Sequence, residues 1–214
     1  MALNKWDYRI KIITCGNTGT GKTLYSATVP KLQSDDPNGI NTTEITVGVE
    51  FNSYRRRVEE KDFLIQLWDT AGQEKYQSLT KLYYHDIAAV LLFFDVTNSK
   101  SFSALPRWMN SIKQNGSNDP VIVVVGNFID RDNYGHRKIT RKQGEQFAKQ
   151  YGAKYVELSA KTKINLEQPL QLIDQEINQR IKDGIIIPGQ NRRGVYDIPL
   201  AASATSSSGC CIIM

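Results

Sequence analysis

The sequence lacks any long run of apolar residues. Its longest uninterrupted run, Ile87–Phe94, spans eight of the 214 residues, whereas a helix that crosses a membrane needs about 20. The first residues, MALNKWDYRIK, also lack the apolar stretch of a signal peptide. The sequence therefore excludes a transmembrane helix and predicts that the protein is not secreted.

Cysteine is scarce and poorly distributed for disulfides. Cys15 lies in the body of the chain, and the other two cysteines, Cys210 and Cys211, are adjacent near its end. This arrangement excludes a disulfide framework. The composition still supports a hydrophobic core, because 40% of the residues are hydrophobic and 23% are charged, as in globular proteins.

A strong excess of one charge is also absent. The net charge is +5, and the basic residues form no continuous stripe. The contiguous Arg55–Arg57 would point to alternate faces of a strand, and the basic residues between 131 and 142 are interspersed with acidic ones. No aromatic–basic interleaving of the kind that binds single strands accompanies them. We therefore expect a solvated surface and no nucleic-acid partner.

Short apolar runs alternate with helical patterns along most of the chain. Ala88–Phe94 and Val121–Val125 are wholly apolar, which is typical of parallel strands covered by helices on both faces. Further strands are predicted at 8–15, 48–57, 63–68 and 155–158, and helices after Gly21, at 99–114, at 140–151 and behind a cap at Asn165. The pattern predicts an α/β fold with a mostly parallel central sheet, one antiparallel edge hairpin and helices on both faces.

Order is expected to end near Gly184. Residues 185–214 include several glycines and prolines and the segment AASATSSSG, and such residues bury little surface. We therefore predict one folded domain over residues 1–184 and a flexible tail over 185–214. Residues 33–44 are turn-formers and predict a long surface loop.

Residues 16–23, with the sequence GNTGTGKT, fit the phosphate-binding pattern G-x-x-x-x-G-K-[ST]. Glycines let backbone N–H groups curve around a phosphate, and the N-terminus of the following helix favours an anion. Lys22 supplies charge for the β- and γ-phosphates, and Thr23 supplies a hydroxyl for Mg²⁺. The predicted phosphate-binding residues are Asn17, Thr18, Gly19, Thr20, Gly21, Lys22 and Thr23.

A second motif, Asp69-Thr70-Ala71-Gly72-Gln73, follows another strand-like run. A carboxylate at the end of such a strand, facing a phosphate loop, can hold Mg²⁺ through water. Gly72 can offer a backbone N–H to a γ-phosphate, and Gln73 can orient an attacking water molecule. We predict Asp69 as a metal residue and Gln73 as the catalytic residue.

These motifs, together with several other segments, resemble the Rab family of Ras-like small GTPases over residues 8–183 and the last five residues. The segments are 46–51 (TVGVEF), 63–68, 75–80 (KYQSLT), 83–84 and 93–97 (FFDVT). The resemblance implies a P-loop GTPase fold in which Thr46 binds Mg²⁺ and the γ-phosphate. It also implies an effector-binding trio, Phe51, Trp68 and Tyr83, for which plain core packing is the alternative.

The resemblance places recognition of guanine at Asn127 and Asp130 and at Ser159-Ala160-Lys161. A carboxylate such as Asp130 would accept two N–H bonds that guanine can donate and adenine cannot, and the Ala160 N–H would reach the base oxygen. Phe128 replaces the family lysine, and no aromatic residue lies between Ser26 and Glu50 to cover the base. We hypothesise that Phe128 stacks on the base. The alternative is that it turns into the core.

The last four residues, Cys211-Ile212-Ile213-Met214, fit the prenylation pattern C-a-a-X, and Cys210 directly precedes them. One lipid chain gives marginal membrane binding, and two give stable anchoring. A final methionine favours farnesyl, whereas the Rab resemblance suggests geranylgeranyl on one or both cysteines.

The resemblance implies a GTP/GDP switch that recruits effectors in vesicle traffic on the cytosolic face of intracellular membranes, with a soluble cytosolic pool. Hydrolysis should depend on Mg²⁺ and be slow, because no arginine finger is evident in the chain. Expected partners are an exchange factor, an activating protein, effectors and a prenyl-binding chaperone. Two alternatives are a membrane-tethered pseudo-GTPase with weak or no turnover, which Phe128 motivates, and a P-loop ATPase, which Asn127 and Asp130 disfavour.

Overall fold

Apolar strands from along the chain assemble into one central sheet. The computed structural model describes residues 6–32, 44–46, 49–70, 84–116, 119–188 and 194–197. The strands are β1 (Tyr8–Cys15), β2 (Glu44–Thr46), β3 (Val49–Val58), β4 (Lys61–Thr70), β5 (Ala89–Asp95), β6 (Val121–Asn127), β7 (Lys154–Glu157) and β8 (Val195–Asp197). The helices are α1 (Lys22–Leu32), α3 (Ser99–Ser103), α4 (Leu105–Asn115), the 3₁₀ helix η2 (Ile129–Tyr134), α5 (Arg141–Gln150) and α6 (Gln168–Lys182).

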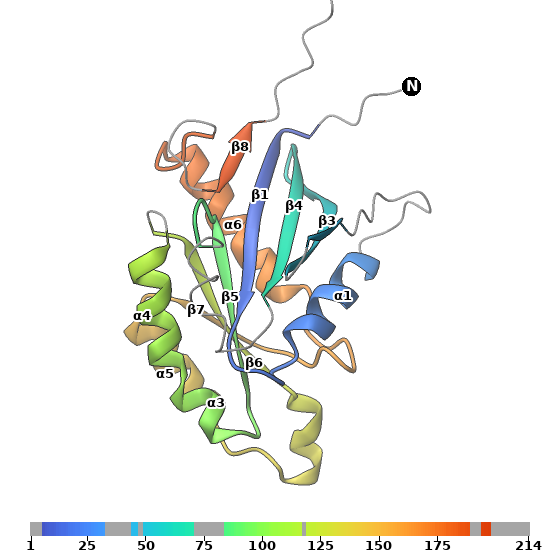
Figure 1. Cartoon of the computed structure of the whole chain (residues 1–214), viewed down its shortest axis with the longest axis vertical. Helices are drawn as coiled ribbons and strands as arrows, with labels where there is room; N and C mark the ends of the chain where they lie inside the picture. The colour runs from blue at the N-terminus through green and yellow to red at the C-terminus, as the bar shows by residue number, and fades with distance from the viewer. Residues whose placement is uncertain are drawn as a thin grey trace, which may run out of the picture.

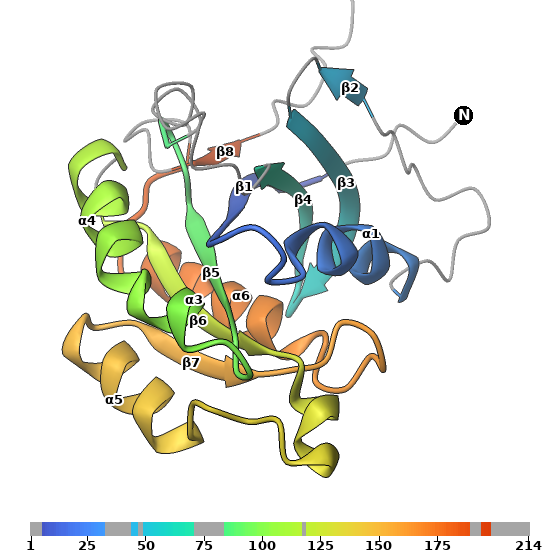
Figure 2. The same ribbon diagram turned by 60° about the horizontal axis from the view of Figure 1, so that its bottom comes forward.

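The sheet is mostly parallel, which confirms the predicted fold class. Within the described residues its order is β2-β3-β4-β1-β5-β6-β7 (Figures 1 and 2). The pairs of β1 with β4 and β5, of β5 with β6, and of β6 with β7 are parallel. The strands β3 and β4 form the predicted antiparallel hairpin, and the short β2 extends it at the edge.

Strand β5 shows why a continuous apolar run predicts a central strand. All seven of its residues are buried, and successive side chains point to opposite faces. Ala89, Leu91 and Phe93 pack in one cluster with α1 and α6, whereas Val90, Leu92 and Phe94 pack in a second cluster with α4 and α5. Helices therefore cover both faces of the sheet, as Figure 2 shows.

The helix predicted over residues 99–114 is interrupted. It consists of α3 and α4, with Ala104 between them. Pro106 lies in the first turn of α4, where its missing N–H is not needed, whereas it could not have donated a bond within one continuous helix. The interruption therefore follows from the proline.

The predicted cap of the last helix is wrong. Helix α6 begins at Gln168 with Pro169 in its first turn, and its N-cap is Glu167, without a side-chain hydrogen bond. Asn165 instead lies in the left-handed region at φ 55°, and its amide donates to the Glu157 carbonyl at 3.0 Å. Among the described helices, none combines the length and the apolar character that spanning a membrane requires.

The sheet extends into the segment predicted to be tail. Val195–Asp197 form β8, which pairs antiparallel with the start of β1 and places Tyr196 opposite Arg9 (Figure 1). Strand β5 pairs with β1 only from Ile12 onward, so β8 covers an edge that would otherwise be open. Val195 is buried in the main core. The predicted boundary near Gly184 is therefore too early.

Candidate nucleotide-binding site

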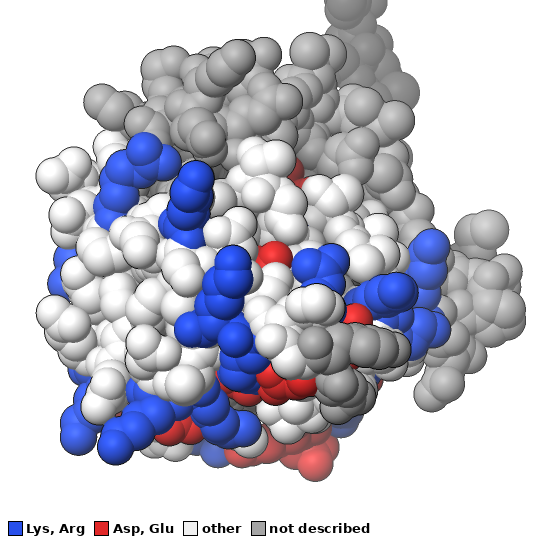
Figure 3. Space-filling view, turned by 90° about the horizontal axis from the view of Figure 1, so that it is seen from below, with Lys and Arg blue, Asp and Glu red and all other residues white. Residues whose placement is uncertain are grey.

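The phosphate loop and the two loops predicted to recognise the base meet at one end of the sheet. The carboxyl ends of β1, β4, β5, β6 and β7 share this edge because these strands run parallel, and ligands of open α/β sheets bind at such an edge. Figure 3 looks onto this end, where Lys and Arg side chains lie on both sides of a group of carboxylates.

At two positions, Gly16 and Gly21, the phosphate loop has a backbone conformation that only glycine adopts readily. Gly16 and Gly21 have φ angles of 127° and 90°, which side chains rarely adopt. A Cβ at Gly16 would lie 2.2 Å from the Phe93 carbonyl oxygen, and one at Gly21 would lie 2.1 Å from the Asn127 amide nitrogen. The two glycines therefore let the loop approach β5 and β6 closely.

Lys22 holds the interior of this loop. Its side chain is buried, and its ammonium donates to the carbonyl oxygens of Gly16 and Asn17 at 2.9 and 2.8 Å. The Thr20 hydroxyl also donates to the Asn17 carbonyl, at 2.8 Å. A fixed positive charge inside a glycine-rich loop that opens a helix is the arrangement that binds phosphate.

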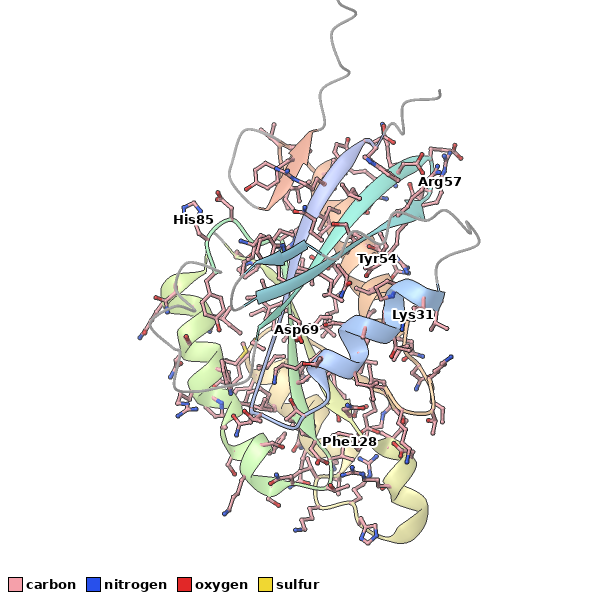
Figure 4. The ribbon with its side chains drawn as sticks, turned by 45° about the vertical axis from the view of Figure 1, so that its right-hand side comes forward. Lys31, Tyr54, Arg57, Asp69, His85 and Phe128 are labelled. Atoms are coloured by element: carbon pink, nitrogen blue, oxygen red, sulfur yellow. The ribbon has the colours of Figure 1, made fainter. Side chains whose placement is uncertain are left out.

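Asp69 and Thr23 are the described side chains suited to a magnesium ion. Asp69 lies on β4 directly beside Thr14 of β1, and the Thr14 hydroxyl donates to its carboxylate at 2.9 Å. Figure 4 shows Asp69 on the sheet near the phosphate loop. Thr23 is in the first turn of α1 and is exposed. One carboxylate and one hydroxyl are few protein ligands, which suits Mg²⁺ held largely by water and phosphate.

Asn127 joins the phosphate loop to the two loops predicted to recognise the base. It is fully buried at the end of β6. Its amide nitrogen donates to the Thr20 carbonyl at 2.9 Å, and its amide oxygen accepts from the N–H groups of Phe128 at 2.7 Å and Ala160 at 3.1 Å. One side chain therefore sets the relative positions of three segments of the site.

The two base loops also contact each other directly. The buried Ser159 donates its hydroxyl to the Asp130 carboxylate at 2.6 Å and accepts from the Thr162 N–H at 3.1 Å. This bond fixes the Asp130 carboxylate to the loop that carries Ser159. Lys161 is exposed beside them.

Phe128 lies at the lower edge of the site, next to the phosphate loop (Figure 4). Its backbone is left-handed, with φ 71°, and it precedes η2. A Cβ at Gly21 would lie 3.5 Å from the ring carbon Cζ. The ring is half-buried and belongs to neither cluster of buried hydrophobic residues. The alternative in which Phe128 turns into the core therefore does not describe this structure.

A charged network behind the base loops fixes η2 to β7. Arg137 pairs with Asp132 of η2 at 2.6 Å and with Glu157 of β7 at 2.9 Å. Hydrogen bonds to Asp132 raise the pKa of Arg137 in spite of partial burial. Tyr155 donates to the same Glu157 carboxylate at 2.8 Å, and burial raises its pKa. Arg137 therefore links η2 to β7, and Tyr155 helps to fix the Glu157 carboxylate with which Arg137 pairs.

Several predicted site residues are placed by backbone alone or lie outside the described residues. Thr46 ends β2, and Phe51 of β3 pairs directly opposite Trp68 of β4. The Trp68 ring is half-buried and lies 5.0 Å from the Lys11 ammonium. The remaining predicted residues, Gly72, Gln73, Tyr83, Cys210 and Cys211, fall outside the described part of the chain.

Two residues outside the predicted set, Trp108 and Thr14, also shape the site. The Trp108 indole N–H donates to the Asn17 side chain at 2.9 Å, which ties α4 to the phosphate loop. Thr14 orients the Asp69 carboxylate. Thr14 interrupts an otherwise apolar strand end, so its burial could have been suspected, whereas no sequence signal pairs Trp108 with Asn17 across 91 residues.

The parallel sheet and the glycine-rich loop with its buried lysine define a P-loop nucleotide-binding protein. A comparison with protein-family models then finds that residues 11–179 match the Ras family. The match covers most of the chain, which therefore belongs to the Ras family. It is a small GTPase, a nucleotide switch of the kind that binds GTP and GDP, generally with Mg²⁺, and hydrolyses GTP.

Proposed function

We propose that this protein is a Rab-like GTPase whose GTP-bound form recruits effectors to the cytosolic face of intracellular membranes in vesicle traffic. The observation that carries its nucleotide chemistry is Lys22, buried inside the phosphate loop on the Gly16 and Asn17 carbonyls. The Rab assignment rests on the two terminal cysteines, the aromatic trio and the Rab-like segments of the sequence at 46–51, 63–68, 75–80, 83–84 and 93–97. An exchange factor, an activating protein and a prenyl-binding chaperone are the expected partners.

The proposed reaction is hydrolysis of GTP. Water attacks the γ-phosphorus, the bond from that phosphorus to the β–γ bridging oxygen breaks, and GDP and inorganic phosphate are released. Lys22 would offset the charge of the β- and γ-phosphates, and Gln73 would orient the water. Mg²⁺ supplies further positive charge to the phosphate oxygens when it is bound, and Thr23, Thr46 and Asp69 would hold it.

The decisive experiment is chromatography of the nucleotide that the purified full-length chain releases on denaturation. We expect GDP or GTP and no adenine nucleotide, because the carboxylate of Asp130 would accept two N–H bonds that guanine can donate and adenine cannot. Adenine nucleotide alone would overturn the assignment. A protein that carries no nucleotide and binds no labelled GDP in titration would support the pseudo-GTPase alternative, which the replacement of the family lysine by Phe128 motivates.

Gln73→Leu should keep nucleotide binding but slow single-turnover GTP cleavage by about 10²-fold or more, with or without an activating protein. The reason is that leucine cannot orient the attacking water. The measurement is phosphate release from preloaded protein, and Gln179→Leu on the exposed face of α6 is the matched control. An unchanged rate in Gln73→Leu would refute the role given to Gln73.

Replacing both Cys210 and Cys211 with serine should leave a protein that no longer sediments with cell membranes but still binds guanine nucleotide. Either single replacement should weaken sedimentation, because one lipid chain anchors only marginally. Membrane fractionation of cells that express each variant measures this. Continued sedimentation of the double variant would show an anchor elsewhere and contradict the proposed lipidation.

A further inference from the structure

Trp108 brings a polar atom to an otherwise apolar face of α4. This face packs on the sheet through Leu105, Trp108, Met109 and Ile112, which repeat at helical spacing. Trp108 is buried, and its indole N–H donates to the Asn17 side-chain oxygen at 2.9 Å. A buried indole N–H needs such a partner, whereas a phenylalanine would fill the same face without that need. Burial alone therefore does not explain a tryptophan at this position.

Asn17, the acceptor of this bond, also carries the internal bonds of the phosphate loop. Its backbone carbonyl accepts from the Lys22 ammonium at 2.8 Å and from the Thr20 hydroxyl at 2.8 Å. Its side chain accepts from Trp108. One residue therefore connects helix α4 to Lys22, whose charge would offset that of the phosphates.

The phosphate loop has little rigidity of its own. All three of its glycines have positive φ angles, which are 127° at Gly16, 78° at Gly19 and 90° at Gly21. Glycine loses more conformational freedom than any other residue when its backbone is fixed. Bonds from outside the loop therefore help to hold it in one arrangement. Asn127 supplies such a bond at the Thr20 carbonyl, and Trp108 supplies another at Asn17.

We propose that Trp108 is a positioning residue for nucleotide binding, which acts through Asn17 to hold the phosphate loop and Lys22 in the arrangement that receives the phosphates of GDP and GTP. The inference rests on the proposed function, because it assigns how that same phosphate site is held ready. A loop that is fixed before binding loses less conformational freedom when the phosphates bind. The bond from Trp108 therefore slows nucleotide release.

Release of fluorescently labelled GDP from the full-length, Mg²⁺-loaded protein tests this role. Trp108→Phe keeps an aromatic ring in the cluster and removes the N–H donor. The loss of one hydrogen bond corresponds to about a two- to tenfold change in an equilibrium constant, so release should be faster by about that factor.

Met109→Ala is the matched control, because it shortens a buried side chain of the same helix and cluster that has no N–H to donate. It should lower the temperature of thermal unfolding at least as much as Trp108→Phe, while GDP release stays within about twofold of wild type. Equal acceleration of release by the two variants would show that the packing of α4 is what matters, and would overturn the proposal.

A double-mutant cycle with Asn17→Leu tests whether Trp108 acts through Asn17. Leucine has a similar size but cannot accept the bond, so release should be accelerated at least as much as in Trp108→Phe. Adding Trp108→Phe to Asn17→Leu should then cause no further acceleration. The indole N–H resonance of Trp108, identified by its loss in Trp108→Phe, should move upfield in Asn17→Leu. Additive effects on release, or an unmoved resonance, would contradict an action through Asn17.

The outcomes separate this inference from the proposed function. A wild-type protein that binds no labelled GDP overturns the proposed function and the role of Trp108 with it. A wild-type protein that binds GDP, and releases it no faster after Trp108→Phe, overturns the role of Trp108 and leaves the GTPase assignment intact.

Discussion

Arg56→Met is expected to lower the free energy of unfolding by about 3–5 kcal/mol. Arg56 of β3 donates to the Asp174 carboxylate of α6 at 2.6 Å, and the two side chains are only 9% and 5% exposed. Methionine fills similar space but leaves a buried carboxylate without its counter-charge. Urea-induced unfolding monitored by circular dichroism measures the loss.

Two variants separate this effect from lost packing. Arg56→Met combined with Asp174→Leu removes both charges and should recover most of the lost stability. Arg57→Met, on the neighbouring exposed residue that pairs with Glu60 and Asp62, should cost less than about 1 kcal/mol. Equal losses from Arg56→Met and Arg57→Met would contradict the assignment of a buried ion pair.

The stability loss in Arg56→Met should also depend on pH. Burial raises the pKa of Asp174 to about 6, although the neighbouring Arg56 opposes the rise. Without Arg56 the carboxyl should be still easier to protonate. A carboxyl whose pKa is raised by folding favours the fold when it is protonated, and this contribution is lost as the pH rises through the folded-state pKa. The gap between variant and wild type should therefore be smaller at pH 5 than at pH 8.

Asn127→Ala should weaken GDP binding by at least about 10²-fold. The change removes three hydrogen bonds at once, so the Thr20 carbonyl and the N–H groups of Phe128 and Ala160 lose their partner. A buried polar group left without a partner costs about 1–3 kcal/mol. GDP release, measured in parallel with thermal unfolding in excess GDP, reports the effect.

Asn165→Ala provides the matched control for Asn127→Ala. Asn165 is an exposed asparagine near the same loops, and its amide donates to the Glu157 carbonyl. Its replacement should change GDP release by no more than a few-fold, because it removes one part-buried hydrogen bond, to Glu157, and none to the phosphate loop. If Asn127→Ala released GDP no faster than Asn165→Ala, Asn127 would not be the residue that joins the three loops.

Several parts of this protein can be predicted from local patterns of residues. The apolar runs of β5 and β6 predict buried parallel strands, because only a strand covered on both faces is apolar at successive positions. Residues 16–23 predict the phosphate loop, since its glycines and lysine are consecutive and need no distant partner to be recognised. Local pattern was less reliable at element ends, where it assigned the wrong cap to α6 and missed the interruption at Ala104.

Contacts between residues far apart in the sequence follow from the assembled fold and not from any local pattern. The bonds from Asn127 to Thr20 and from Arg56 to Asp174 join residues 107 and 118 positions apart. The strands β1 and β8 pair although they lie near opposite ends of the described part of the chain. Even Arg131 and Phe128, three residues apart, stack only because the left-handed Phe128 leads into a 3₁₀ turn. Such contacts depend on strand register and backbone direction, which are set when the whole sheet assembles and not by the residues on either side of each position.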